Sequence, residues 1–248
     1  MMHVRDFVVD IETCHASEKF ICAAQFKILR DVIPKNFKDP VKIASAQEKI
    51  EAKYEAGKKR IRDKSACLNA APIGCIGMAA DDRLLNFSIL KFSDADLEVL
   101  SGQGIEPFTF QDEKSMMQSF VDFVNDGSSE YSRIAGFNSF KFDFPKIRLA
   151  CRRNDVRLPE ILKPVCHQNQ IDLMRDFIRE YNCEDAHRLM ISLHTVCDEF
   201  GIEYKKTLTG AEIPGAIHEG KPGQHLTVAL DCTSDVIETY KALLKIRG

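Results

Sequence analysis

Two carboxylates stand one residue apart near the start of the chain, inside an apolar stretch. Residues 4–11 predict a buried strand, and side chains at positions i and i+2 of a strand lie on the same face, so Asp10 and Glu12 are expected side by side. Neighbouring buried carboxylates repel each other and lose hydration unless a proton or a cation lies between them. The pair indicates a cation site; the alternative is a strand that ends in a loop, where Asp10 begins a turn and Glu12 is solvated.

Three more aspartates lie where a helix could fix their carboxylates. Asp143 comes two residues before a proline at the start of a helix predicted over 144–154, which is the usual arrangement of an N-cap with proline in the first turn. Capping and metal binding are compatible, because a helix N-terminus also fixes the position of the carboxylate. Asp231 and Asp235 are four residues apart and share one face of a last helix predicted over 232–246. Asp231 could cap that helix, whereas Asp235 lies inside it.

These acidic motifs occur in an order that resembles a known family. An Asp-x-Glu strand, residues 136–138 (Gly-Phe-Asn) followed by 142–145 (Phe-Asp-Phe-Pro), and a final Asp235 resemble the DEDD superfamily of 3′–5′ exonucleases. The similarity is to the exonuclease domain of family B DNA polymerases and to stand-alone, often phage-encoded, relatives. Residues 33–40, the charged helix after them, and residues 171–174 also resemble the stand-alone proteins. The resemblance implies an RNase H-like α/β fold, with an antiparallel meander of three strands, further parallel strands and helices on both faces.

The resemblance also implies a metal-dependent reaction. Asp10, Glu12, Asp143 and Asp235 would hold two divalent cations, Mg²⁺ or Mn²⁺, which suit an all-carboxylate site. Carried over from the family, Asp10 binds both ions, Glu12 and Asp235 hold the ion that activates water, and Asp143 supports the ion at the departing 3′ oxygen. The product would be a 5′-nucleoside monophosphate.

Residues 137–140, just before Asp143, offer candidate substrate contacts. Phe137 and Phe140 could stack on the terminal bases, since aromatic rings stack on bases with little sequence preference, and the Asn138 amide could lie beside the terminal nucleotide. The alternative is that both phenylalanines belong to the core.

One position departs from the family pattern. The family has a tyrosine four residues before the last aspartate, or a histidine five before it, that orients the attacking water; here these positions hold Asp231 and Leu230. Asp231 could accept a proton or a hydrogen bond from the water, which makes it a catalytic candidate, or it could only cap the helix. His218 and His225 precede it in a glycine-rich tract and could reach the site or lie at the surface.

Length and composition limit the class of protein. A chain of 248 residues with 44% hydrophobic residues can bury a core, and we expect one domain over 1–248 with an insertion at about 15–70. There is no apolar run of transmembrane length and no secretory signal at the start, so we expect a cytoplasmic protein without a membrane partner. Nine cysteines without a C-x-x-C pair indicate reduced thiols. The net charge of -3 argues against a basic coat that binds nucleic acid non-specifically.

The coarse pattern predicts the other elements. A charged helix over 44–66 is either a solvated amphipathic helix packed on the body or a basic helix that flanks a substrate groove or a partner surface. The further predictions are a hairpin over 72–79 and 83–90, a helix over 112–125, a strand over 131–137, helical segments near 171–180 and 189–200, and a long loop or short hairpin over 205–225.

Three functions fit these features. The first is a metal-dependent 3′–5′ exonuclease that acts on single-stranded DNA or frayed 3′ ends, either free-standing or as a subunit, because no polymerase domain follows residue 248. The second is a nucleic-acid-binding module that keeps the fold with weak or no catalysis, with replication or repair proteins as partners. The third is an exoribonuclease, since distinguishing the sugars requires contacts to the 2′ position that the sequence does not reveal.

Overall fold

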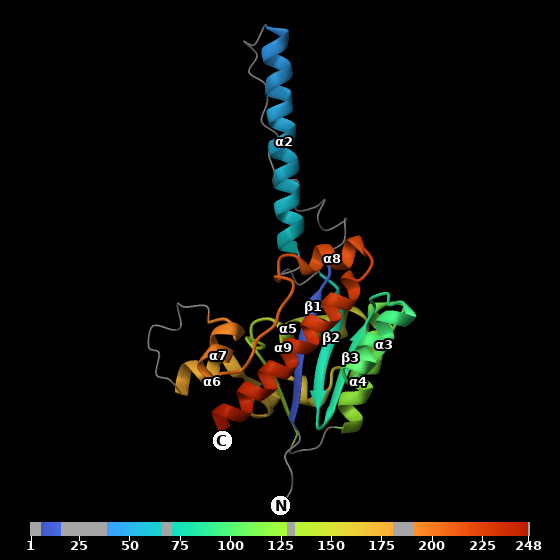
Figure 1. Ribbon diagram of the computed structural model, residues 1–248, viewed down its shortest axis with the longest axis vertical. Coiled ribbons are helices and arrows are strands. Elements are labelled where there is room, and N and C mark those ends of the chain that lie inside the picture. Colours follow the sequence, from blue (N-terminus) through green and yellow to red (C-terminus); the bar gives the residue numbers. More distant parts are fainter. Residues whose placement is uncertain (1–5, 16–38, 66–70, 128–131, 181–190, 248) are drawn as a thin grey trace, which may run out of the picture.

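The computed structural model describes residues 6–15, 39–65, 71–127, 132–180 and 191–247, which form a layered α/β structure (Figure 1). The sheet has six strands in the order β4-β3-β2-β1-β5-β6. The strands are β1 (Asp6–Thr13), β2 (Ile73–Ala80), β3 (Arg83–Ser88), β4 (Ile105–Thr109), β5 (Arg133–Gly136) and β6 (Gln170–Asp172).

The pairing of the strands confirms the predicted mixed sheet. β1 pairs antiparallel with β2, and β2 with β3, which is the expected three-strand meander. β1 pairs parallel with β5, β5 with β6, and β3 with β4. In this order β1 lies inside the sheet. β5 pairs with its first part, Asp6–Val8, and β2 pairs with it from Phe7 to Thr13, so β2 holds the part that carries Asp10 and Glu12.

Helices cover both faces of the sheet, as predicted, and this explains why β1 is apolar on both sides. Phe7, Val9 and Ile11 join the core beneath α4 (Glu113–Gly127) and α5 (Asp143–Arg153). Val8 points to the other face, where α6 (Leu173–Glu180), α7 (Leu193–Glu199) and α9 (Gln224–Arg247) pack. Since strand side chains alternate, Asp10 and Glu12 continue the row of Val8 on the α9 face.

Two connections complete the body. α3 (Asp94–Gly102) carries the chain from β3 to its parallel neighbour β4, and it begins with a capping box between Ser93 and Asp96. α8 (Ile213–Glu219) precedes α9, and short 3₁₀ turns at Glu160–Leu162 and Pro164–Asn169 lead into β6. Among the helices that the structure describes, none is both long enough and apolar enough to cross a membrane.

The sequence missed or misplaced several of these elements. It predicted neither α3 nor β4, and it predicted a helix where the chain first forms β6. It treated residues 205–225 as a loop or hairpin, whereas α8 forms there with its proline in the first turn, a position that suits proline. The last helix begins at Gln224, so Asp231 lies about two turns inside it and does not cap it.

α5 also corrects one detail of the predicted site. The helix begins at Asp143, and Phe142 holds the N-cap position without a side-chain hydrogen bond. Asp143 is thus the first residue of the helix and not its cap. Its carboxylate remains fixed by the first turn of α5, where the exposed N–H groups favour negative charge.

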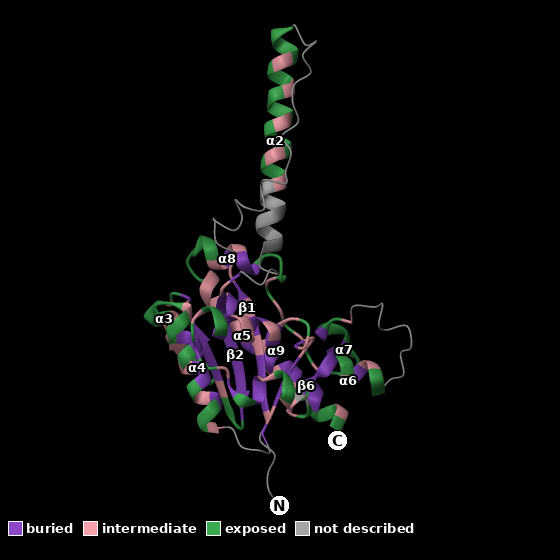
Figure 2. Ribbon diagram, turned by 180° about the vertical axis from the view of Figure 1, so that it is seen from behind, coloured by how far each residue is buried: buried purple, intermediate pink, exposed green. Residues whose placement is uncertain are grey.

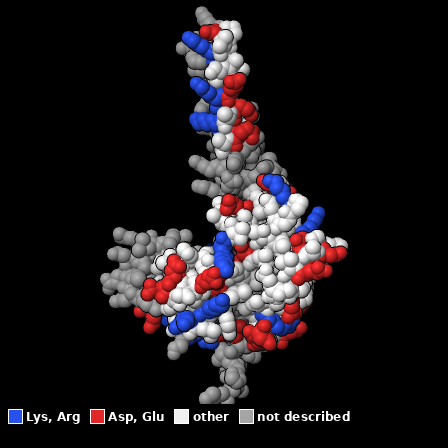
Figure 3. All heavy atoms as spheres, viewed as in Figure 1, with Lys and Arg blue, Asp and Glu red and all other residues white. Residues whose placement is uncertain are grey.

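The long helix α2 (Pro40–Ser65) projects away from the sheet and its helices (Figure 1). Its described side chains are exposed or half-buried, which contrasts with the buried sheet (Figure 2). The interpretation of α2 as a helix packed on the body is therefore wrong. Basic side chains lie toward one edge of α2 and acidic ones toward the other (Figure 3). The rest of the predicted insertion, residues 16–38 and 66–70, lies outside the described residues, as does the segment 33–38 used for the resemblance.

Candidate metal site

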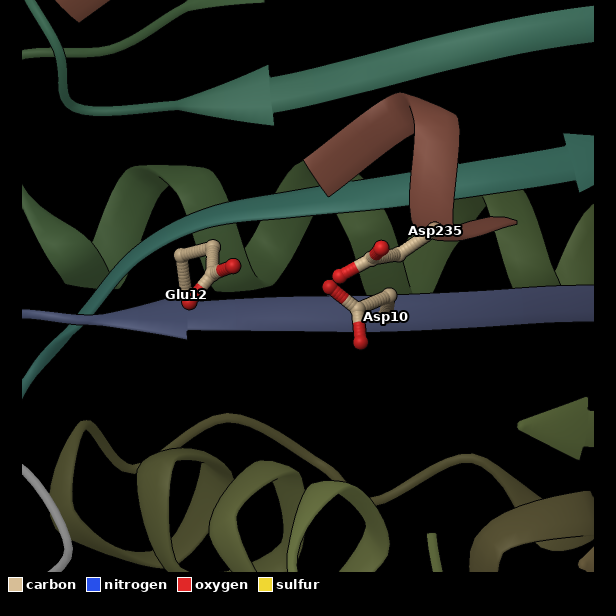
Figure 4. Close-up of side chains that lie close together, drawn as sticks. All are labelled: Asp10, Glu12 and Asp235. Atoms are coloured by element: carbon tan, nitrogen blue, oxygen red, sulfur yellow. The ribbon is translucent and has the colours of Figure 1, made fainter. Parts of the chain in front are cut away.

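Asp10, Glu12 and Asp235 converge at the centre of the sheet. Each offers a carboxylate oxygen, and these oxygens lie within 4.8 Å of one another. Asp10 and Asp235 direct their carboxylates toward each other, and Glu12 lies farther along β1 (Figure 4). The cluster thus joins the start of the chain to its last helix.

A glycine in β2 lets α9 approach β1 closely. A Cβ atom at Gly77 would lie 3.0 Å from the Cys232 carbonyl oxygen and 3.1 Å from its Sγ. The Gly77 N–H donates to Cys232 Sγ at 3.2 Å, and the Cys232 thiol donates to the Asp10 carbonyl at 3.6 Å. Because Cys232 lies one helical turn before Asp235, this contact places the Asp235 carboxylate over β1.

Asp143 lies beside these three residues, but its carboxylate oxygens do not lie within 4.8 Å of all three of the others. Its side chain is buried, with 2% of its surface exposed. Burial is the main cause that raises the pKa of Asp143, and repulsion by the charge of Glu12 adds to it, while hydrogen bonds from the backbone of Asp143 and Ile11 act in the opposite direction. Four carboxylates from β1, α5 and α9 therefore share one buried region.

Burial and mutual repulsion raise the pKa of all four carboxyl groups. Burial is the largest cause in each case. It raises the pKa of Glu12 to about 7 and that of Asp143 to about 8. The pKa of Asp10 is raised further by the charges of Asp235, Asp143 and Glu12. Because ionised carboxylates are unfavourable in this buried region, the site favours the binding of a proton or a cation.

Three of the carboxylates have an oxygen that nothing described in the structure satisfies. Asp10 Oδ2, Asp143 Oδ1 and Asp235 Oδ1 are buried and have no hydrogen-bond partner among the described residues. A buried acceptor without a partner is costly, and carboxylate oxygens are the ligands that Mg²⁺ and Mn²⁺ prefer. These residues therefore fit a divalent cation site.

Lys206 is the residue of this site that the sequence reasoning missed. Its Nζ lies 2.5 Å from Asp235 Oδ2 and 3.6 Å from Glu12 Oε1, and 21% of its side chain is exposed. Despite burial, the charges of Glu12, Asp235 and Asp10 hold the pKa of Lys206 above its usual range. The Tyr204 hydroxyl also hydrogen-bonds to Asp235. Both residues belong to an irregular segment, which gave no periodic signal.

Asp231 and Glu238 hold that segment against α9. Asp231 accepts the backbone N–H of Thr207 at 3.0 Å and that of Leu208 at 2.7 Å. Glu238 Oε1 accepts the backbone N–H of Lys205 at 3.3 Å. Asp231 thus anchors the chain on one side of Lys206, and Glu238 anchors it on the other. This role differs from the two that the sequence suggested for Asp231, a helix cap and a contact to the attacking water.

The two candidate histidines are engaged elsewhere. His225 Nδ1 accepts the Lys91 N–H at 3.0 Å, and its Nε2 lies 3.1 Å from the Ile217 carbonyl. The His218 ring lies 5.8 Å from the His15 ring. Both histidines line a surface hollow of about 770 Å³, whose lining includes none of the four carboxylates.

The stretch before Asp143 has a strained residue and two half-buried rings. Asn138 has φ +54°, and its Oδ1 is buried without a hydrogen-bond partner among the described residues. Asp172 holds the stretch by accepting the Phe140 N–H at 3.0 Å. Phe137 and Phe140 both pack against the core, on opposite faces of the sheet.

Comparison with known families agrees with this architecture. A family profile described as RNase_H superfamily matches residues 87–217, slightly more than half of the chain. The matched region runs from β3 to α8 and so does not include the strand of Asp10 and Glu12 or the helix of Asp235. No curated protein matches the chain significantly. On the family match and the mixed sheet, the chain belongs to the RNase H superfamily.

Proposed function

We propose that the protein is a metal-dependent 3′–5′ exonuclease that hydrolyses DNA from single-stranded or frayed 3′ ends and releases 5′-nucleoside monophosphates. One observation carries the proposal: in an RNase H superfamily fold, buried carboxylates gather with three oxygens that lack a hydrogen-bond partner among the described residues. The direction of degradation, the preference for DNA and the use of two Mg²⁺ or Mn²⁺ ions come from the resemblance to DEDD exonucleases.

The four carboxylates supply the ligands. Asp10, Asp143 and Asp235 present their unsatisfied oxygens, and Glu12 lies beside them on β1. Bound divalent cations would activate water and stabilise charge on the phosphate and the leaving oxygen. The rigid sheet and α9 hold the carboxylates in place before substrate arrives, because Gly77 and Cys232 fix the distance between these elements.

Substrate contacts are assigned to the stretch before Asp143. The Asn138 Oδ1 can accept a hydrogen bond from a terminal nucleotide, since its buried oxygen is unsatisfied within the described protein. Phe137 and Phe140 are half-buried and remain candidates for base stacking, although both pack against the core and the Phe140 ring also lies beneath the Arg175 guanidinium. The Asp172 hydrogen bond to Phe140 keeps this stretch in position.

A second candidate function is a nucleic-acid-binding module with little catalysis. It is favoured by the use of Asp231: both of its oxygens accept backbone N–H groups, so it is not poised as a base. Such a module would keep the fold and bind replication or repair intermediates.

Labelled oligonucleotides separate these functions. We expect 5′-labelled single-stranded DNA to shorten stepwise with Mg²⁺ or Mn²⁺, and 3′-labelled DNA to release labelled mononucleotide at once. Degradation of RNA but not DNA would replace the proposal with an exoribonuclease. Tight binding without cleavage in either metal would contradict a nuclease and support the binding module.

A further inference from the structure

A lysine ammonium group lies among the four carboxylates, of which Asp143 and Asp235 are buried and Asp10 and Glu12 half-buried. Lys206 Nζ contacts Asp235 Oδ2 at 2.5 Å and lies 3.6 Å from Glu12 Oε1. These two oxygens come from different elements, α9 and β1, so the ammonium bridges them as a cation would. Glu12 and Asp235 have only 12% and 10% of their side chains exposed, so the bridge is largely shielded from water.

The chain is built to hold Lys206 at this point. Its neighbours on both sides are fixed by acidic residues of α9: Lys205 by Glu238, and Thr207 by Asp231. Asp231 is 3% exposed and Glu238 is 3% exposed, so both anchors are buried. Because the backbone is held on each side, Lys206 loses little additional freedom when it pairs with Asp235.

The carboxylate oxygens that lack a hydrogen-bond partner are not the ones that pair with Lys206. Lys206 contacts Asp235 through Oδ2, whereas Oδ1 of the same carboxylate is unsatisfied within the described residues. The other unsatisfied oxygens belong to Asp10 and Asp143, whereas the ion pairs of Lys206 are with Glu12 and Asp235. The region thus divides into a position filled by the ammonium, between Glu12 and Asp235, and a position that still lacks a cation.

The charges agree with this division. Four ionised carboxylates carry -4; adding Lys206 (+1) and one divalent cation (+2) leaves -1. For these groups alone, a second divalent cation beside Lys206 would make the sum +1, so the positive charges would exceed the negative charges of the ligands. A phosphodiester supplies one negative charge and would bring that sum to zero.

We propose that Lys206 is a built-in counter-ion that fills one of two cation positions, so that the substrate-free protein binds one divalent cation and takes up the second with the phosphate of a nucleic acid. This rests on the proposed function in that the carboxylates are a metal site. Lys206 is a positioning residue: it controls when the site becomes fully loaded with metal.

Equilibrium binding of Mn²⁺ tests the proposal without any measurement of activity. Free Mn²⁺ is followed by electron paramagnetic resonance while it is titrated into metal-free protein. We expect one Mn²⁺ per wild-type chain and two per Lys206→Met chain. Lys205→Met is the matched control, because Lys205 is exposed and pairs with Glu203 outside the site; it should bind one, as should Lys206→Arg.

The substrate arm uses a single-stranded phosphorothioate oligonucleotide that resists hydrolysis. The wild type should rise from one Mn²⁺ to two when the oligonucleotide is present, and Lys206→Met should stay at two. Equal numbers in the wild type and Lys206→Met without DNA would overturn the role of Lys206. Absence of Mn²⁺ binding in every variant would instead overturn the metal site on which the proposed function depends. Lys206→Gln replaces Lys206→Met if the latter is unfolded by circular dichroism.

Discussion

Replacing Asp143 by asparagine should stabilise the metal-free protein at neutral and alkaline pH. Burial and the charge of Glu12 raise the pKa of Asp143 to about 8. A carboxyl group with a raised pKa binds its proton more tightly in the folded chain than in the unfolded one. Its contribution to stability is therefore complete below about pH 4 and is lost as the pH rises to about 8. Asparagine has the same shape and does not titrate, so the Asp143→Asn variant escapes this loss.

The size of the effect follows from the pKa. A rise from 3.8 to about 8 is worth about 1.36 kcal/mol for each unit, or roughly 6 kcal/mol in total, as an upper bound. Asparagine keeps an acceptor for the backbone hydrogen bond from Ile11 but leaves its own amide N–H groups buried, which costs about 1–3 kcal/mol. We therefore expect Asp143→Asn to raise the free energy of unfolding by roughly 3–5 kcal/mol above pH 8. At pH 4 it should lower the free energy of unfolding by about 1–3 kcal/mol, because only the cost of the buried amide remains.

Urea denaturation from pH 4 to pH 9 in EDTA measures this difference. Asp82→Asn, in the exposed turn between β2 and β3, is the control for loss of one negative charge. Addition of Mn²⁺ should narrow the difference above pH 8 by up to about 2.7 kcal/mol, because a ligand at one hundred times its Kd stabilises the wild type by that amount and the variant has lost a metal ligand. A stability difference that stays constant from pH 4 to pH 9 would refute the reasoning about Asp143.

Three further predictions concern the supports of the site. Asp231→Ala should lower the free energy of unfolding by roughly 2–4 kcal/mol, because it leaves the N–H groups of Thr207 and Leu208 unpaired. It should also reduce any nuclease rate, while Mn²⁺ binding persists. Unchanged stability in urea would show that these hydrogen bonds contribute nothing. Asn138→Ala should cost about 1 kcal/mol in thermal denaturation because φ is +54°, whereas Asn138→Gly should not, and equal losses in both would exclude backbone strain as the cause. Glu113→Gln should destabilise the protein by about 1–3 kcal/mol, since Glu113 accepts the Ile73 N–H and pairs with Arg153, and a neutral outcome in urea would contradict that role.

The strand that carries Asp10 and Glu12 could be predicted because strand periodicity is local. Alternation places Asp10 and Glu12 on one face whatever the rest of the chain does, and the structure has both on the α9 face of β1. The hairpin of β2 and β3 could be predicted from two apolar segments and the turn between them. The three-strand meander and the helices on both faces were expected from the resemblance to the DEDD family, and the structure has both. The alternative of a strand that frays into solvent before Glu12 is wrong, because β1 continues to Thr13.

The residues that the sequence did not reveal are placed by contacts between distant segments. Lys206 lies in an irregular stretch and reaches Asp235 only because Asp231 and Glu238 hold its neighbours. α9 begins earlier than predicted because its first two turns bury Val228 and Ala229 against other elements. The sequence prediction began the helix after Asp231 and so did not include these turns. The projection of α2 from the body likewise depends on tertiary structure and not on its own periodicity.

We propose that Asp10 and its neighbours bind the metal with which the protein hydrolyses phosphodiester bonds. The most direct measurement is the release of 5′-mononucleotide from single-stranded DNA by the wild type and by Asp10→Asn, each with Mn²⁺ and with EDTA. We predict release by the wild type with Mn²⁺ and at least a thousandfold less in the other three samples, as expected when a catalytic metal is lost. Equal release by Asp10→Asn, or release that persists in EDTA, would contradict the account.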